Sequence, residues 1–263
     1  MSSSELFYFR GVVAYDGTGF QGWQSQKNGQ GIQDQILAAL KQVSDSEFNR
    51  IVGSGRTDSG VHAHQQVFTL RMTRNIPPES LLKAINTKLS QAIRVIELAY
   101  CSKDFHPLKN VIKKEYNYFF STSKTLDPCL SNYVLSYPFP VDLPSIIKAA
   151  NIFEGEHDFA LFSNTGSEVK DTIRSIQVSQ IHQIEGRFLP FLPISNEIYQ
   201  YQVIGKGFLK QMVRNMAGAL LMVGRGKLSE DDLTRSVTEN VPLPYKYCAP
   251  ARGLHQMDVK YLD

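Results

Sequence analysis

Hydrophobic and polar residues follow strand and helix spacings in turn along the first part of the chain. Residues 6–15 are rich in aromatic and β-branched types and end at Asp16-Gly17-Thr18-Gly19, which predicts a strand running into a turn. After Gly31 the apolar residues recur with helical spacing, at Ile32, Ile36, Ala39, Leu40 and Val43. The pattern therefore predicts a first strand followed by a helix.

Two further strands, a helix and another strand are predicted before residue 105. Residues 51–52 and the alternating run 68–72 have strand patterns, and residues 53–66 lie between them. Pro77-Pro78-Glu79 is typical of a helix start, and we expect that helix to continue to about residue 89. Residues 93–99 predict the next strand, so the order resembles β-α-β-β-α-β.

A comparable set of elements begins again after Phe105-His106-Pro107, and we place the domain boundary there, between residues 1–105 and 106–263. We expect strands at 115–121, 173–184, 198–204 and 256–261, and helices at 144–153 and 208–223. Gly224 would end the last helix in a left-handed conformation. The prediction is a mixed α+β fold of two α/β halves that share or adjoin a largely antiparallel sheet.

The predicted helix 208–223 has two unlike sides. Its apolar residues form one stripe, which we interpret as core, while Lys206, Lys210 and Arg214 are four residues apart and face another side. No acidic residue occurs between residues 198 and 229. This concentration of positive charge predicts a surface that faces phosphates, although the net charge of the whole chain is only +3.

Composition excludes several classes of protein. Hydrophobic residues make up 42% and charged residues 20%, as in ordinary globular proteins. The longest apolar stretch, residues 216–223, is too short to span a bilayer, and the first residues lack a secretory signal, so a cytoplasmic protein without membrane attachment is expected. The three cysteines are far apart and include no Cys-x-x-Cys pair, so neither disulfides nor a metal cluster is expected.

Residues 53–64, Gly-Ser-Gly-Arg-Thr-Asp-Ser-Gly-Val-His-Ala-His, concentrate chemically active side chains between two predicted strands. On the residues alone, Asp58-Ser59-Gly60 could be a simple turn. The alternative is a catalytic loop, because a guanidinium such as that of Arg56 orients a neighbouring carboxylate and keeps it ionised. Trp23, the only tryptophan, is interpreted as a core residue.

Residues 55–63 resemble the signature Gly-Arg-Thr-Asp-x-Gly-Val-His-Ala of the TruA-type tRNA pseudouridine synthases. The resemblance continues in the family's order through Tyr15-Asp16-Gly17-Thr18, Tyr116-Asn117-Tyr118, Met212-Val213-Arg214-Asn215 and Ala249-Pro250-Ala251-Arg252-Gly253-Leu254. It implies two ferredoxin/RRM-like α/β domains with a basic cleft between them, usually in a homodimer. It also implies isomerisation of uridines 38 to 40 in the anticodon arm of tRNA, without a cofactor.

The resemblance also implies roles for particular residues. The family's nucleophilic aspartate corresponds to Asp58, the neighbouring arginine to Arg56, and the arginine that pairs with the aspartate to Arg214. Tyr116 corresponds to the tyrosine that stacks on the extruded base. We expect the remaining substrate contacts at His62, Lys206 and Lys210.

One part of the sequence departs from the family pattern. Where Phe-His-Ala-Arg is usual, this chain has Phe105-His106-Pro107-Leu108 and so lacks the arginine. Lys109, Lys113 or Lys114 could replace its RNA contact, although a lysine lacks the two-pronged geometry of a guanidinium.

Pseudouridine formation moves the ribose from N1 to C5 of uracil and needs neither redox carrier nor ATP. The sequence accordingly lacks the glycine-rich nucleotide-binding motifs. Asp58 could attack the ribose, add to the uracil ring or abstract a ribose proton, and the sequence does not decide among these routes.

Two other functions fit parts of the sequence. His62 and His64 would lie on one face of a strand, and with Asp58 they could form the zinc site of a hydrolase or nuclease. A tRNA-binding module without activity would keep the basic surface but would have lost Asp58 or Arg214, and this chain has both.

Overall fold

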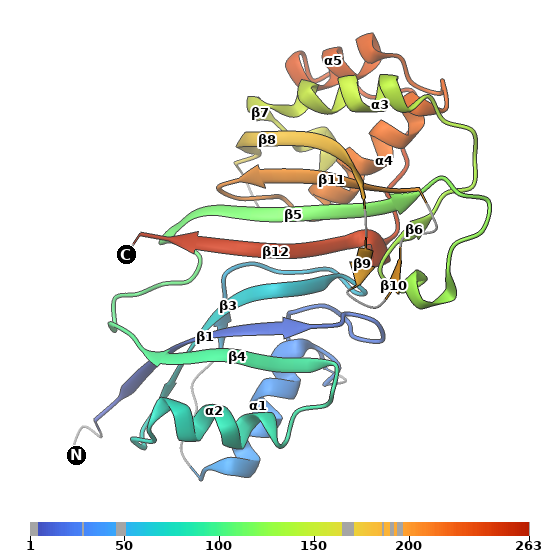
Figure 1. Cartoon of the computed structure of the whole chain (residues 1–263). Coiled ribbons are helices and arrows are strands. Elements are labelled where there is room, and N and C mark those ends of the chain that lie inside the picture. Colours follow the sequence, from blue (N-terminus) through green and yellow to red (C-terminus); the bar gives the residue numbers. More distant parts are fainter. Residues whose placement is uncertain are drawn as a thin grey trace. The chain divides into compact units, whose positions relative to one another are not determined.

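A computed structural model describes residues 5–27, 29–45, 51–164, 171–185, 187–189, 192–193 and 197–262. The chain forms two compact units (Figure 1): unit 1 is Met1–Ile112 with Gln256–Asp263, and unit 2 is Lys113–His255. Compared with the predicted boundary at 105/106, the chain enters unit 2 a few residues later and its last residues return to unit 1. The two-domain organisation itself stays a prediction.

The sheet of unit 1 is built from β1 (Phe7–Tyr15), β3 (His62–Met72) and β4 (Ile93–Tyr100), in the order β4-β1-β3. All three are antiparallel, and Phe9 lies opposite both Leu70 and Tyr100. The short β2 (Val52–Gly53) also pairs with β3, and β12 (Leu254–Tyr261) lies on the other edge of β3. Strand β3 begins earlier than predicted, which shortens the loop before it to residues 54–61.

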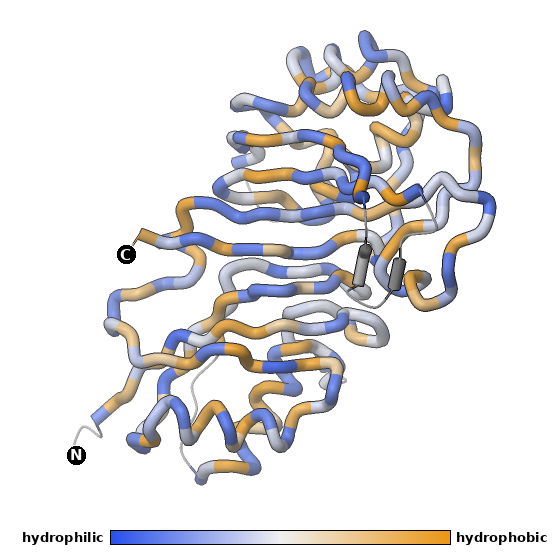
Figure 2. The backbone as a smooth tube through the Cα atoms, in the orientation of Figure 1, coloured by the Kyte–Doolittle hydropathy of each residue, from blue (hydrophilic) through white to orange (hydrophobic). Residues whose placement is uncertain are grey.

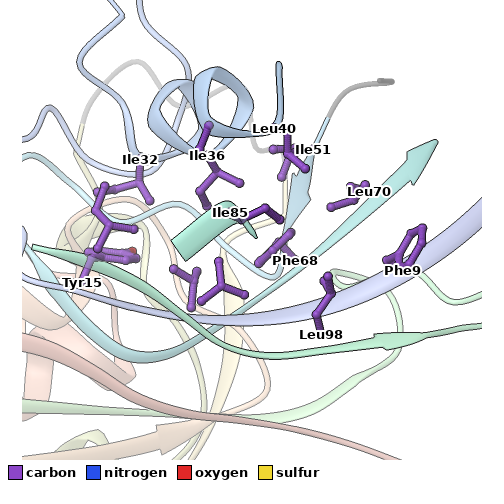
Figure 3. Close-up of a cluster of buried hydrophobic side chains, with 14 of the residues drawn as sticks. Phe9, Tyr15, Ile32, Ile36, Leu40, Ile51, Phe68, Leu70, Ile85 and Leu98 are labelled. Carbon is purple, nitrogen blue, oxygen red and sulfur yellow. The ribbon is translucent and has the colours of Figure 1, made fainter. Parts of the chain in front are cut away.

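Two helices cover one face of this sheet (Figure 1): α1 (Ile32–Val43) and α2 (Pro78–Asn86). The helical spacing predicted for α1 is confirmed, because Ile32, Ile36 and Leu40 are all fully buried. Figure 3 shows these side chains packed with those of the strands, and Tyr15 at one end of the cluster beside Ile32. The other face carries a smaller core of Val12, Val67, Val111 and Val259.

Helix α2 ends at Asn86, earlier than the predicted residue 89. The side chain of Asn86 donates to the carbonyl oxygen of Val95 (2.8 Å) and accepts from its N–H (3.0 Å), which joins the end of α2 to β4. Leu89 still packs against the core after the helix has ended. The apolar pattern therefore continued beyond the helix.

The sheet of unit 2 has the order β5-β11-β8-β7 and its paired neighbours are antiparallel. Its strands are β5 (Val111–Ser121), β11 (Ile198–Gly205), β8 (Ile173–Ile184) and β7 (Gly155–Asp158), with β6 (Leu135–Ser136) parallel to β5. A separate two-stranded sheet is made of β9 (Arg187–Leu189) and β10 (Leu192–Pro193). Figure 2 shows polar and apolar residues alternating along β8 and β11.

Unit 2 contains the helices α3 (Leu143–Ala150), α4 (Met212–Gly224) and α5 (Glu230–Thr238). Short 3₁₀ turns occur at Pro128–Leu130, Asn151–Phe153, Ala160–Phe162 and Ala251–Gly253. Helix α5 was not predicted. Its start is marked by a capping box, in which Ser229 and Asp232 bond each other's backbone N–H groups.

The helix predicted over 208–223 begins four residues later than predicted and ends one residue later, at Gly224. The helix begins only at Met212, since Gln211 has left-handed backbone angles (φ 59°), and the carbonyl oxygen of Lys210 accepts from Asn164 N–H (3.1 Å). The left-handed residue at the other end is Gly226 (φ 66°), and Gly224 still belongs to the helix. Gly224 packs so closely on Ile146 that a Cβ there would lie 2.3 Å from its Cδ1.

Helix α4 is also buried on more sides than a single apolar stripe requires. Apart from the half-buried Arg214 and Asn215, every residue of the helix is buried. None of the helices in the described part of the chain is both long and apolar enough to cross a membrane.

Candidate active site

The loop that carries Asp58 is fixed at its beginning by strand β3. Ser54 is fully buried, its N–H donates to the carbonyl oxygen of Val67 (2.8 Å), and its hydroxyl donates to the side-chain oxygen of Gln66. The amide nitrogen of Gln66 donates in turn to the carbonyl oxygen of Gly55 (3.0 Å). One buried glutamine therefore holds two consecutive loop residues.

The middle of the loop is held by a second segment, the turn that follows β1. The hydroxyl of Thr57 lies 2.8 Å from that of Tyr15, and both side chains are buried. The N–H of Trp23 donates to the carbonyl oxygen of Thr57 (3.2 Å). Trp23 is 1% exposed and its ring stacks on that of Tyr15, which confirms that it is a core residue.

The end of the loop is held by the same turn. The hydroxyl of Ser59 and the N–H of Gly60 both donate to the carbonyl oxygen of Phe20, at 3.1 Å and 3.3 Å. The N–H of Val61 donates to the carbonyl oxygen of Asp58 (3.2 Å), which closes a tight turn. The backbone on both sides of Asp58 is thus fixed by hydrogen bonds.

This close contact between turn and loop requires glycine at two positions. A Cβ on Gly17 would lie 2.0 Å from the carbonyl oxygen of Val61, and one on Gly22 would lie 2.3 Å from that of Thr57. Gly22 also has a left-handed backbone (φ 80°), which other residues adopt only with strain. The glycines of the turn therefore allow the loop to lie directly against it.

The charged side chains of this loop, those of Asp58 and Arg56, remain accessible. Arg56 is exposed and Asp58 is half-buried, whereas Thr57, Val61 and His62 are buried. The loop thus presents a carboxylate and a guanidinium between buried anchors. Such an arrangement restricts the backbone of Asp58 without closing the carboxylate off from a substrate.

His62, predicted as a substrate contact, is only 3% exposed. Its Nδ1 atom lies 3.1 Å from the N–H of Gly17 and 3.2 Å from the carboxylate of Asp16. A neutral ring accepts from Gly17, whereas a protonated ring pairs with Asp16. Both arrangements fasten β3 to the turn after β1.

His64, the other residue of the possible zinc pair, is exposed. In the part of the chain that the structure describes, no three histidine, cysteine, aspartate or glutamate side chains form a group that could hold a metal ion.

Tyr116 and Arg214 belong to unit 2. Tyr116 lies on β5 opposite Val203, is 7% exposed, and meets the ring of Phe208 edge to face at 5.0 Å between centroids. The Nε of Arg214 donates to the carbonyl oxygen of Ala249 (2.8 Å), and the N–H of Ala249 donates to the carbonyl oxygen of Arg214 (3.1 Å). The first turn of α4 is therefore tied to the segment before β12.

Lys206 and Lys210 are exposed and lie in the segment between β11 and α4. The predicted row of three cations along one helix side is therefore wrong, because only Arg214 is in the helix. Both lysines still belong to the positively charged stretch and remain accessible to a polyanion.

Among the lysines considered as replacements for the missing arginine, Lys109 is exposed, Lys113 half-buried and Lys114 buried. Leu108, at the position of that arginine, is 51% exposed. Burial, together with the nearby charge of Arg174, lowers the pKa of Lys114 to about 8. Sequence reasoning missed Arg174, since an arginine in an alternating strand carries no distinguishing pattern.

Comparison with known proteins identifies a family for this chain. Residues 12–107 and 149–262 match the family model described as tRNA pseudouridine synthase. This chain belongs to the tRNA pseudouridine synthase family. The family is one of isomerases that modify tRNA, and the matched residues include the loop of Asp58 as well as the helix of Arg214.

Relatives are similar over nearly their whole length. The chain is 33% identical to "tRNA pseudouridine synthase A 2" of Desulfotalea psychrophila, over 96% of this chain and 98% of that protein. It is 36% identical to "tRNA pseudouridine synthase A 1" of Bacillus cereus, over 95% and 97%. A solved structure, "Crystal Structure of a Cbf5-Nop10-Gar1 Complex", matches with a TM-score of 0.39 and 13% identity, covering 94% of this chain and 48% of that one. That likeness is too low to support an argument.

Proposed function

We propose that this member of the family isomerises uridines 38, 39 and 40 in the anticodon arm of tRNA, with the carboxylate of Asp58 as the nucleophile and without a cofactor. The observation that carries the proposal is the construction of the loop around Asp58. Buried anchors on both sides hold the backbone, while the carboxylate stays accessible beside the exposed Arg56. A nucleophile needs this combination of fixed position and open approach.

The reaction breaks the bond from N1 to C1′, turns the uracil and forms a bond from C5 to C1′. The proton at C5 leaves and N1 gains a proton, so the product has the same composition as the substrate. We propose that Asp58 acts at the ribose or at the uracil ring during the exchange, and that Arg56 orients its carboxylate and offsets the loss of solvation.

A base inside a stem must leave the helix before an enzyme can act on it, and an aromatic ring commonly holds such a base. We propose Tyr116 for this contact. Its ring is already oriented by Phe208 and by its place in β5. Arg214 is proposed to pair with the nucleophile or the substrate, and its tie to Ala249 limits the positions of its guanidinium.

The exposed Lys206 and Lys210 are proposed to bind phosphates of the tRNA. By the same resemblance we propose that the enzyme works in the cytoplasm as a homodimer. Analytical ultracentrifugation at micromolar concentration tests the dimer: a single species of about twice 29.6 kDa supports it, and a monomer rejects it.

The purified protein tests the proposed function with unmodified tRNA transcripts, in a buffer that contains a chelator and no nucleotide. Pseudouridine is mapped by carbodiimide labelling and primer extension. Pseudouridine at positions 38 to 40 and its absence from transcripts with cytidine at these positions are the expected results. No pseudouridine in a complete tRNA pool would favour a silent binding module, and activity that returned only with added zinc would contradict the cofactor-free mechanism.

A further inference from the structure

Thr57 is the residue next to the proposed nucleophile, and both its side chain and its backbone are held by neighbouring residues. Three contacts hold it: its hydroxyl lies 2.8 Å from that of Tyr15, its carbonyl oxygen accepts from Trp23, and Gly22 packs directly on that oxygen. Thr57 is 7% exposed and Tyr15 is 4% exposed. Neither side chain is placed to contact a tRNA.

The partner of Thr57 is itself held rigidly. Tyr15 is the last residue of β1, its ring belongs to the core cluster of unit 1 (Figure 3), and it stacks on Trp23 with 6.3 Å between centroids. The hydroxyl of Tyr15 therefore has a fixed position relative to the sheet. Because the Thr57 hydroxyl contacts this fixed hydroxyl, the position of Thr57, and of the peptide bond that joins it to Asp58, is restricted as well.

The hydroxyl pair is not needed to close the loop. The loop is already held at its start by Gln66 and at its end by Phe20, and His62, the residue that follows the loop, is held by Gly17. Those bonds would remain if a valine replaced Thr57, because valine has the same shape without the hydroxyl. The hydroxyl pair instead adds a tether from the Thr57 side chain to the core, which restricts the position of the Thr57 backbone immediately before Asp58.

We infer that Tyr15 and Thr57 are positioning residues, whose hydroxyl pair sets the direction of the Asp58 carboxylate toward the reacting uridine. The inference rests on the proposed role of Asp58. Since a nucleophile misplaced by about 1 Å loses roughly 100-fold in rate, loss of the pair should lower kcat by about 10- to 100-fold. Binding of tRNA should change little, because both hydroxyls are buried.

The test measures kcat and KM for Tyr15→Phe, Thr57→Val and the double variant on one tRNA transcript. We expect each single variant to lower kcat at least about 10-fold and to leave KM within about twofold of the wild-type value. The kcat of the double variant should not fall below that of the less active single variant, because both substitutions remove the same interaction. Thr57→Ser keeps the hydroxyl and should recover most of the lost rate.

Unit 2 offers a matched control. Ser179 and Tyr201 form another buried hydroxyl pair, 2.9 Å apart, with both side chains at most 1% exposed. Tyr201→Phe removes the same kind of bond from the core and should shift the unfolding midpoint as Tyr15→Phe does. Its kcat should stay within about twofold of the wild type if ordinary loss of stability does not affect the chemistry.

The outcomes separate the inference from the proposed function. If Asp58→Asn is inactive but Tyr15→Phe and Thr57→Val keep the wild-type kcat, the inference is wrong and the proposed nucleophile stands. The inference also fails if Tyr201→Phe loses as much kcat as Tyr15→Phe, or if Thr57→Ser recovers nothing. Full activity of Asp58→Asn would reject the proposed function, and the inference with it.

Discussion

The loop of residues 54–61 in unit 1 and the segment of residues 206–214 in unit 2 carry the charged groups of the proposed site, but they are built differently. The loop has side-chain and backbone bonds to two neighbouring segments, so its anchors are buried. The segment is held mainly through its backbone, at Lys210 and at the start of α4, and its lysines are exposed.

This difference suggests a division of tasks. A fixed carboxylate suits a step in which the position of one atom determines the rate. Exposed lysines suit attraction of a polyanion, since phosphate contacts depend on charge more than on exact placement. Changes in the loop should therefore affect kcat, and changes to the lysines should affect binding of tRNA.

Arg214 is the exception in unit 2, and its removal should have the largest effect among the changes considered there. Arg214→Ala is expected to lower kcat/KM by about 100- to 1000-fold, as removal of a single stabilising donor does in other enzymes. Arg214→Lys should recover little, because a lysine lacks the planar fork. Steady-state kinetics on one transcript checks this. A loss confined to KM would instead place Arg214 among the binding cations.

Gly22 in unit 1 and Gly226 in unit 2 both have left-handed backbone angles, so replacing each by alanine compares the two units directly. Gly22→Ala combines a strained backbone with a clash against Thr57 and should cost about 3 kcal/mol of unfolding free energy together with most of kcat. At Gly226 no atom lies within 4 Å of an added Cβ, so Gly226→Ala should cost only about 1–2 kcal/mol and leave kcat unchanged.

Urea unfolding and kcat of the two variants measure the contrast. Equal losses of kcat in both would show that the turn after β1 has no special role in positioning the loop.

The lowered pKa of Lys114 predicts that the stability of the protein depends on pH. Its folded pKa of about 8 lies below the usual lysine value of 10.5, so the unfolded chain binds more protons between these values and stability rises with pH across that window. Below about pH 8 the buried charge opposes folding by a constant amount. Lys114→Met should therefore be more stable than the wild type near pH 7, by on the order of 2 kcal/mol.

Near pH 10 this advantage should largely disappear. Denaturant unfolding of both proteins at the two pH values measures it, and a difference that does not depend on pH would contradict the lowered pKa of Lys114.

Lys210→Ala should have the smallest effect. Loss of one phosphate contact should weaken binding of tRNA and lower the slope of log K against log salt by about 0.7–0.9. Lys88, an exposed lysine at the end of α2, provides the control, and its replacement should leave the slope unchanged. Filter binding over a range of salt concentrations tests this. An unchanged slope for Lys210→Ala rejects the proposed phosphate contact.

Most elements of the fold could be predicted from local pattern. The strand 173–184 and helix α1 were predicted almost to the residue, and in α1 the apolar spacing coincides with the buried positions. The start of α4 could not be, since Leu209 is buried before the helix begins and so extends the helical spacing. Helix α5 has few apolar residues, and its capping box was the available signal.

The candidate site was predictable as a motif but not as a structure. The resemblance pointed to Asp58 and Arg56, whereas the contact of Tyr15 with Thr57 joins residues 42 positions apart and has no local signal. The contacts of His62 with Asp16 and Gly17 likewise join distant positions and could not be predicted, while its predicted contact with substrate stays a prediction. Contacts between distant segments decide which of the polar residues are anchors.

Release of tritium from tRNA that carries 5-tritiated uridine tests the central claim most directly. It should be measured in a single turnover with enzyme in excess, for the wild type and for Asp58→Asn, together with the binding of tRNA by both. The wild type is expected to release tritium from the target uridines, and Asp58→Asn to bind tRNA with similar affinity but release none. Release by Asp58→Asn at the wild-type rate would contradict the assignment of Asp58 as the nucleophile.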